Sequence, residues 1–298
     1  MQWQSVRHLS TQQAQLAVRS RLYKMKGAEL QLICRGCNVR QGGTKSDIYT
    51  RLDHHFSNII AAAAADNDRV HLDRILPPSI MSFDLGYKNL AYVHMAKDET
   101  ILGWQRIDLG IVETFHPSHT APLVHSFVRE HIEPYIALEK DQKSDTVGAF
   151  VLERQRYRDN SAKTVLENTI IVNTIEALLW SSLLYTTRIK NAPYVIFDAT
   201  ARQAVDRVFK DDLDRLKPPI KNNKGTKNTT SRDYYRKKKA TVLLATEWLD
   251  SQTAPAFKEQ FHKDSKKDDL SDCLLQGIAW LKWRRFTRDF ISDCVNRS

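Results

Sequence analysis

The sequence has little of what marks several common protein classes. It contains only 4 Cys among 298 residues, too few for a disulfide framework, so we expect reduced thiols and an intracellular compartment. It has no run of 18 uncharged apolar residues, so no segment is expected to span a membrane. With only 10 Gly, it shows no glycine-rich loop of the kind that cradles nucleotide phosphates. We therefore expect no nucleotide cofactor.

Basic residues are in excess. The chain has 45 Lys and Arg against 35 Asp and Glu, which gives a formal net charge of +10. Such a charge favours a polyanionic partner, and nucleic acid before a membrane surface. An apolar content of 42% with 6 Trp supports a sizeable core. The length fits one large domain and a small module.

The N-terminal segment has no acidic residue before Glu29. Its basic residues lie among Ser, Thr, Gln and Leu, at Arg7, Arg19, Arg21, Lys24 and Lys26. This composition is typical of a mitochondrial presequence or its remnant. It is equally typical of the basic N-terminus of a DNA-binding protein. Residues 1–20 are therefore assigned as a basic segment, with mitochondrial targeting as one of two interpretations.

Four acidic residues lie at the ends of predicted elements. Asp84 and Glu153 each end a short apolar run, which is typical of the C-terminal part of a buried strand. Asp269 and Asp272 are three residues apart at the start of a predicted helix and share one face. Asp268, four residues before Asp272, is the alternative to Asp269. Each acid alone has another explanation: turn formation for Asp84, local ion pairing for Glu153, and the helix dipole for the helix acids. Together they predict a site for Mg²⁺ or Mn²⁺, which prefer hard oxygen ligands.

The apolar pattern predicts an α/β fold. Strands are expected at 80–85, 90–95, 101–109, 149–153 and 194–197, and helices at 123–138, 164–185, 201–209, 232–249 and 270–290. The segment 164–185 is apolar almost all round and is expected to be a buried helix. A three-stranded meander followed by alternating helix and strand indicates a mixed five-stranded sheet flanked by helices. This arrangement resembles the ribonuclease H-like superfamily.

A small all-helical module is expected to precede the sheet. Two helices, near 28–34 and 45–56, flank a glycine-bearing turn. The spacing resembles the SAP module, a small DNA-binding motif, at Glu29, Leu30, Gly36, Gly43, Lys45 and Leu52. The alternative is a helical hairpin used only for packing. We assign residues 21–57 to the SAP-like module, 58–78 to a helical linker that ends at two prolines, and 79–298 to the ribonuclease H-like domain.

The larger domain resembles the RuvC-type Holliday-junction resolvases, and in particular their fungal mitochondrial branch. The strings that carry the resemblance are FDLGYKNLAY (83–92), LERQRYR (152–158) and KKDDLSDC (266–273). It implies an endonuclease of the mitochondrial matrix that makes paired symmetric nicks in four-way DNA junctions. It also implies two Mg²⁺ ions per active site, or Mn²⁺ in their place, with Asp84, Glu153, Asp269 and Asp272 as catalytic ligands; Asp268 stays open as the alternative.

Basic residues near the acids suit a DNA ligand. The predicted contacts are Lys45 in the SAP-like module, Arg154, Arg156, Tyr157 and Arg158 after the catalytic strand, Arg236, Lys237 and Lys238 in a second basic stretch, and Lys266 and Lys267 before the acidic helix. The second basic stretch spans 217–239, and its first half is predicted to be a mobile loop. Tyr157, Tyr234 and Tyr235 are candidates to wedge between unstacked bases.

Two matched nicks in a two-fold symmetric junction favour a C2 homodimer. Its interface is expected at 164–185 or near Trp280 and Trp283, which are equally good core candidates. Two rival functions remain. One is a catalytically silent, SAP-containing mitochondrial DNA-binding protein, against which the presence of all four acids argues. The other is an actin-like ATPase or sugar kinase, which opens with Asp-x-Gly but needs further glycine-rich loops.

Overall fold

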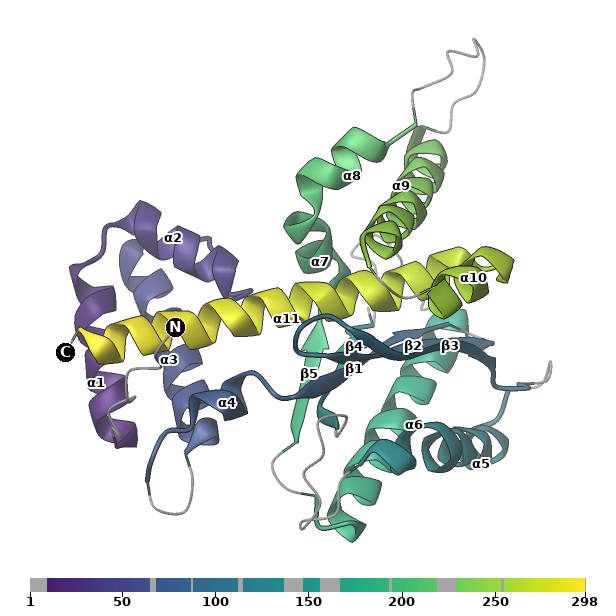
Figure 1. Ribbon diagram of the computed structural model, residues 1–298, viewed down its shortest axis with the longest axis horizontal. Coiled ribbons are helices and arrows are strands. Elements are labelled where there is room, and N and C mark those ends of the chain that lie inside the picture. Colours follow the sequence, from purple (N-terminus) through teal and green to yellow (C-terminus); the bar gives the residue numbers. More distant parts are fainter. Residues whose placement is uncertain are drawn as a thin grey trace. The chain divides into compact units, whose positions relative to one another are not determined.

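The protein is described by a computed structural model that covers residues 10–64, 68–86, 88–111, 115–136, 147–155, 167–192, 195–218, 229–252 and 255–297. Its elements are labelled in Figure 1. The chain divides into a helical unit, Met1–Pro77 with Trp280–Ser298, and a sheet unit, Pro78–Ala279. The last helix, α11 (Lys267–Asn296), contributes residues to both.

The helical unit contains α1 (Thr11–Lys24), α2 (Gly27–Gly36), α3 (Lys45–Ala63) and the short α4 (Leu72–Ile75). The predicted helix–turn–helix therefore forms. Thr44 and Asp47 exchange hydrogen bonds in a capping box that starts α3, since the first N–H groups of a helix need acceptors. The core of this unit is apolar and includes Val18, Leu22, Leu30, Leu52 and Phe56.

The unit boundaries differ from those expected from the sequence. Residues from Thr11 onward form a regular helix whose Ala14 and Val18 are buried, so they belong to the folded helical unit. The expected helical linker begins as a continuation of α3, which runs on to Ala63, because the alanines after residue 60 favour helix. The end of α11, from Trp280, also groups with the helical unit.

The sheet unit has the predicted mixed five-stranded sheet. Its strands are β1 (Ser79–Leu85), β2 (Asn89–Ala96), β3 (Ile101–Asp108), β4 (Val147–Glu153) and β5 (Ile196–Thr200). Their order is β3-β2-β1-β4-β5. β1, β2 and β3 pair antiparallel, whereas β1, β4 and β5 are parallel. The carboxyl ends of the three parallel strands therefore meet at one edge.

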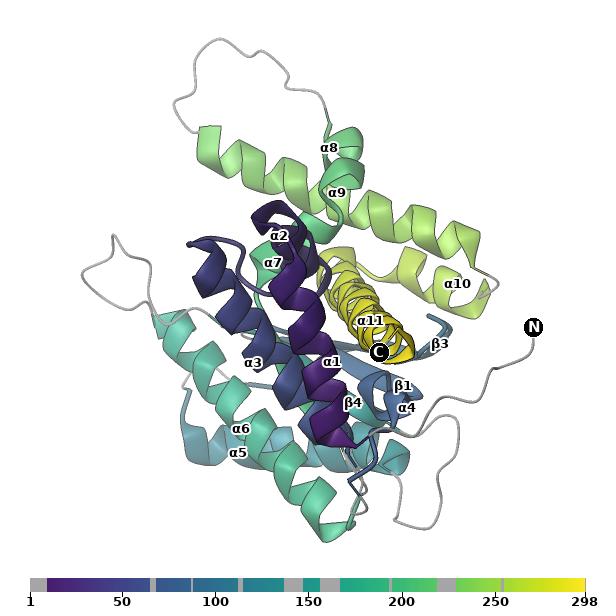
Figure 2. The same ribbon diagram turned by 90° about the vertical axis from the view of Figure 1, so that its left-hand side faces the viewer.

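Helices cover the two faces of the sheet. α5 (Pro117–Phe127) and α6 (Glu167–Ile189) lie on one face and α11 on the other (Figure 1, Figure 2). Because side chains alternate along a strand, Met81 and Phe83 of β1 enter the core shared with α5 and α6. Ser82 points to α11, where its Cβ would lie 3.3 Å from a Cβ built on Gly277. Asp84 follows the same alternation and faces α11.

The remaining helices connect the strands. A helix was expected at 123–138. The regular α-helix α5 ends at Phe127, and the chain continues as a π-helix, Val128–Ile132, and a 3₁₀ helix, Glu133–Tyr135. Pro134 has no N–H with which to continue the α-helical hydrogen bonds. After β5 come α7 (Arg202–Val208) and α8 (Lys210–Leu216), and then α9 (Thr229–Ser251). α10 (Pro255–Lys263) was not predicted.

The prediction that 164–185 is buried all round is wrong. In α6 one stripe packs on the sheet, including Ile171, Ile175 and Leu179, while Tyr185 and Ile189 are 58% and 62% exposed. Among the helices of the described residues, α6 is long and apolar enough to cross a membrane, with a mean hydropathy of 1.2 over the tested window. One such helix is weak evidence for a membrane span, because a core helix that packs on a sheet can have the same length and hydropathy.

A change of Gly277 to Leu is expected to weaken the fold. Its Cβ would lie 3.3 Å from Ser82 Cβ and 3.5 Å from Val93 Cγ1, so a larger side chain must push α11 off the sheet. Overpacking of this kind costs about 1–3 kcal/mol of unfolding free energy, measurable by urea denaturation. Gly27→Leu is the control, because nothing lies within 4 Å of a Cβ there. Equal losses in the two variants would contradict the close helix–sheet contact.

Candidate active site

Asp84 and Glu153 lie side by side at the carboxyl edge of the parallel strands. The register pairs Phe83 of β1 with Leu152 of β4, so the next residues of both strands, Asp84 and Glu153, are neighbours. Crevices at the carboxyl ends of strands in open α/β sheets are common ligand sites. The two predicted carboxylates are thus brought together by strand register alone.

Helix α11 supplies the other two carboxylates and is fixed to the sheet by Gln276. The Gln276 side-chain nitrogen lies 3.0 Å from Ser82 Oγ, 3.0 Å from the Phe83 carbonyl oxygen and 3.2 Å from the Val151 carbonyl oxygen. These acceptors belong to β1 and β4, immediately before their acidic ends. Because Asp272 is one helical turn before Gln276, this anchor sets the height of Asp272 above the strands.

The four carboxylates share one electrostatic environment. Burial raises the pKa of Asp84 well above its usual range, and the negative charges of Asp272, Glu153 and Asp269 raise it further. The side chains remain reachable, since those of Glu153 and Asp272 are 23% and 15% exposed. Like charges gathered this closely repel one another, so a compensating cation would stabilise the cluster.

The two neighbouring acids of α11 have different partners. Asp268 Oδ2 accepts a hydrogen bond from Lys238 Nζ at 2.5 Å, and although burial opposes it, this bond lowers the pKa of Asp268. Burial and the adjacent Asp268 charge raise the pKa of Asp269, and Asp269 contributes to the raised pKa of Asp84. Asp268 is thus engaged by Lys238, whereas the charge of Asp269 acts on Asp84.

Arg202 is a member of the cluster that sequence reasoning did not identify. Its Nη1 lies 2.6 Å from Asp272 Oδ2 and 3.9 Å from Glu153 Oε2, and its Nε lies 3.4 Å from Asp206 Oδ1. Arg202 is the first residue of α7, where the helix dipole disfavours a positive charge. An arginine at the start of a predicted helix could therefore have indicated that carboxylates lie nearby to stabilise its charge.

The oxygen donors fit a divalent cation, although they are not arranged around one. Within the described part of the chain, no group of three or more His, Cys, Asp or Glu side chains is placed to coordinate one metal ion. The Arg202 guanidinium engages an Asp272 oxygen, with 2.6 Å between Nη1 and Oδ2, and lies 3.9 Å from Glu153 Oε2. Three carboxylates raise the pKa of Asp84 and one guanidinium, that of Arg202, lowers it. The cluster therefore keeps an excess of negative charge, which suits Mg²⁺ or Mn²⁺.

The predicted DNA contacts lie in several settings. Lys45 is exposed at the start of α3, and Lys266 and Lys267 lie at the start of α11. Arg154 is exposed just after Glu153. In α9, Arg236 pairs with Asp233 at 2.9 Å, Lys237 with Asp206, and Lys238 with Asp268, so two of these three cations reach carboxylates beside the cluster. Arg156, Tyr157 and Arg158 lie outside the described residues, as does 219–228 of the second basic stretch.

The tyrosines proposed as wedges remain candidates. Tyr234 and Tyr235 of α9 are 57% and 66% exposed, and their rings meet edge to face with centroids 5.8 Å apart. An exposed aromatic pair on a basic helix suits base stacking.

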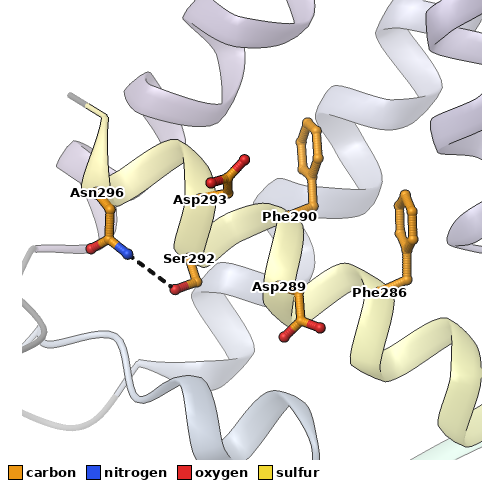
Figure 3. Close-up of a pocket in the computed structure, with 6 residues that line it drawn as sticks. All are labelled: Phe286, Asp289, Phe290, Ser292, Asp293 and Asn296. Carbon is orange, nitrogen blue, oxygen red and sulfur yellow. Dashed lines mark hydrogen bonds between the residues drawn. The ribbon is translucent and has the colours of Figure 1, made fainter. Parts of the chain in front are cut away.

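A separate hollow lies on the helical unit, at the end of α11. Its volume is about 440 Å³, and its lining comprises Phe286, Asp289, Phe290, Ser292, Asp293 and Asn296 (Figure 3). Its carboxylates make it a poor phosphate site, and Asp293 is already paired with Arg21 at 2.7 Å. The hollow shares no residue with the acidic cluster.

The chain is similar to several known proteins. The family described as mitochondrial resolvase Ydc2 / RNA splicing MRS1 matches residues 80–264 and 252–290. A mitochondrial cruciform cutting endonuclease 1 of Schizosaccharomyces pombe is 23% identical over 289 residues, covering 89% of this chain and 95% of that protein. The Saccharomyces cerevisiae protein of the same name is 23% identical over 266 residues, covering 73% and 72%. The crystal structure of the yeast mitochondrial Holliday junction resolvase Ydc2 has a TM-score of 0.57 at 19% identity, covering 92% of this chain and 99% of that one, which shows the shared fold.

Replacement of Gln276 by Leu is expected to destabilise the sheet unit. The variant keeps the volume but removes the donor, so buried oxygens of Ser82 and Phe83 lose a partner. The expected loss is about 1–3 kcal/mol of unfolding free energy, measured by chemical denaturation. Gln260→Leu is the control, because it removes one bond, to the Trp104 carbonyl oxygen, at an exposed position. A loss for Gln276→Leu no larger than the control would show that Gln276 does not anchor α11.

Proposed function

The chain belongs to the family of the mitochondrial resolvase Ydc2 and the RNA-splicing protein MRS1, and from this premise we propose that it is a metal-dependent endonuclease that resolves four-way DNA junctions by paired symmetric nicks. The observation that carries the proposal is the convergence of Asp84, Glu153, Asp269 and Asp272 at one edge of the sheet. Burial makes such a group of like charges unfavourable unless it binds cations.

The four carboxylates are the proposed ligands of two Mg²⁺ ions, with Mn²⁺ able to replace them. Two bound metal ions would supply an activated water and neutralise negative charge on the phosphate and on the leaving oxygen. Asp84 adjoins Glu153 in the strand register and is acted on by the charges of Asp272 and Asp269, so it is the acid that would be central to a metal site. Gln276 and the strand register hold the four side chains in place. Asp268 is proposed to hold Lys238 rather than a metal ion.

The family description also includes RNA splicing, which is the second candidate function. A protein that only binds RNA gains nothing from buried, mutually repelling carboxylates, and the acidic cluster would weaken its attraction for phosphates. The cluster therefore favours hydrolysis over binding alone. The same argument stands against a silent DNA-packaging role.

Positive charge and symmetry support a junction as the substrate. Exposed Lys45 in the SAP-like helical unit and Lys266 beside the cluster suit phosphate contacts. The exposed apolar side chains of α6, Leu184, Tyr185 and Ile189 among them, offer a surface for a second copy of the chain. A C2 homodimer gives the two matched sites that paired nicks require. Trp280 and Trp283 are buried, which leaves α6 as the better interface candidate.

The proposed compartment is the mitochondrial matrix. The two yeast relatives are named as mitochondrial proteins, and the basic N-terminal segment has a presequence-like composition. Imaging of the full chain with a C-terminal fluorescent tag tests this, and a nuclear or cytosolic signal would contradict it.

The assay that tests the function compares four substrates with the purified full chain. A labelled four-way junction, linear duplex DNA, an RNA–DNA hybrid and a structured RNA are each incubated with Mg²⁺ or with EDTA. We expect symmetric nicks in the junction alone, and only with Mg²⁺. Tight RNA binding without cleavage of any substrate would move the chain to the splicing class, and ATP turnover without nicking would move it to the actin-like class.

Substitutions of single acids separate ligands from their neighbours. Asp84→Asn and Asp269→Asn are expected to reduce junction cleavage by about 100-fold or more, because each removes charge stabilisation of several kcal/mol, while junction binding persists. Asp268→Asn, the matched neighbour, is expected to cost less than about tenfold, because its partner is Lys238. Single-turnover cleavage and gel-shift binding measure both effects. A larger loss for Asp268→Asn than for Asp269→Asn would exchange their roles.

A further inference from the structure

Arg202 approaches two carboxylates of the acidic cluster, and it also contacts Asp206, a carboxylate outside the cluster. Its Nη1 contacts Asp272 at 2.6 Å and approaches Glu153 at 3.9 Å. Its Nε lies 3.4 Å from Asp206, which also accepts a bond from Lys237 of α9. The guanidinium is therefore tethered on both sides, with the side chain 24% exposed.

The contacts of Arg202 conflict with the binding of a cation at the same oxygens. A carboxylate oxygen bonded to a guanidinium has fewer lone pairs for a metal ion, and two positive charges a few ångströms apart repel one another. Without a cation, however, Asp272 and Glu153 need a positive neighbour, because a buried charge that lacks a partner is costly. Arg202 meets this need in the structure, and a divalent cation would replace it.

We propose that Arg202 is a positioning residue that neutralises the acidic cluster before metal binds and yields Asp272 and Glu153 to the incoming cation. The contact between Arg202 Nε and Asp206 does not involve the cluster acids, so it can persist when Arg202 leaves Asp272. A phosphate is its natural next partner, since the planar donor fork of Arg matches phosphate oxygens. The inference deepens the proposed nuclease function and rests on it for the identity of the cation.

The test is calorimetric titration of Mn²⁺ into EDTA-dialysed full-length protein, in the absence of DNA. Arg202→Gln removes the competing charge, so its apparent Kd for Mn²⁺ is expected to fall by about tenfold, the scale of one partly exposed ion pair. Arg202→Lys keeps the charge without the fork, and its Kd should lie between those of the wild type and Arg202→Gln. Lys190→Gln is the control: it removes a partly buried pair with Glu133 of 3.1 Å on the other face of the sheet and should leave the Kd unchanged.

Thermal unfolding gives a second readout. In EDTA, Arg202→Gln is expected to melt below the wild type, because its carboxylates lose their counterion, and Mn²⁺ should raise its melting temperature by more than it raises that of the wild type. A merely structural role predicts the lower melting temperature with weaker Mn²⁺ binding. If Arg202→Gln does not fold, the tighter Kd of Arg202→Lys carries the test.

The outcomes separate this inference from the nuclease proposal. A Kd for Arg202→Gln equal to or weaker than that of the wild type, or no Mn²⁺ binding by either protein, overturns the role of Arg202. Tighter binding by the variant supports it even if the wild type fails to nick junctions, in which case only the nuclease proposal fails.

Discussion

Repulsion among four carboxylates is the constraint on which the rest of the sheet unit depends. Parallel pairing of β1 and β4 brings Asp84 beside Glu153, and α11 places Asp269 and Asp272 against them. None of these side chains gains stability from the others. The surrounding structure must therefore hold them by other means: Gln276 bonds the helix to both strands, Gly277 permits close approach, and Arg202 supplies positive charge.

This arrangement connects the fold to its function. Clusters of charge that weaken a fold are found where chemistry needs them, and acids with a shared need for a cation suit phosphodiester hydrolysis. Two basic residues of α9 pair with carboxylates next to the cluster, Lys237 with Asp206 and Lys238 with Asp268. A network of alternating charges thus extends from the acids to the basic helix that is proposed to meet DNA, so metal binding and DNA binding can influence one another.

Much of this could be predicted from the sequence, because the signals are local. Short apolar runs bounded by turn signals indicated the five strands, and acids at strand ends and at one helix start gave Asp84, Glu153 and Asp272. Arg202 and Gln276 could not be found in the same way, since their partners are 70 and 194 residues distant in the chain for the contacts Arg202–Asp272 and Gln276–Ser82. The exposed side of α6 was missed for a related reason: an apolar helix does not show in its sequence which stripe meets the sheet.

The central claim is that Asp84, Glu153, Asp269 and Asp272 together bind divalent cations. Anomalous diffraction from crystals of the protein soaked in Mn²⁺ tests it most directly. We expect manganese density in contact with oxygens of Asp84, Glu153 and the α11 acids, with the Arg202 guanidinium moved away from Asp272. Manganese bound elsewhere, with Arg202 still on Asp272 at saturating concentration, would contradict the account.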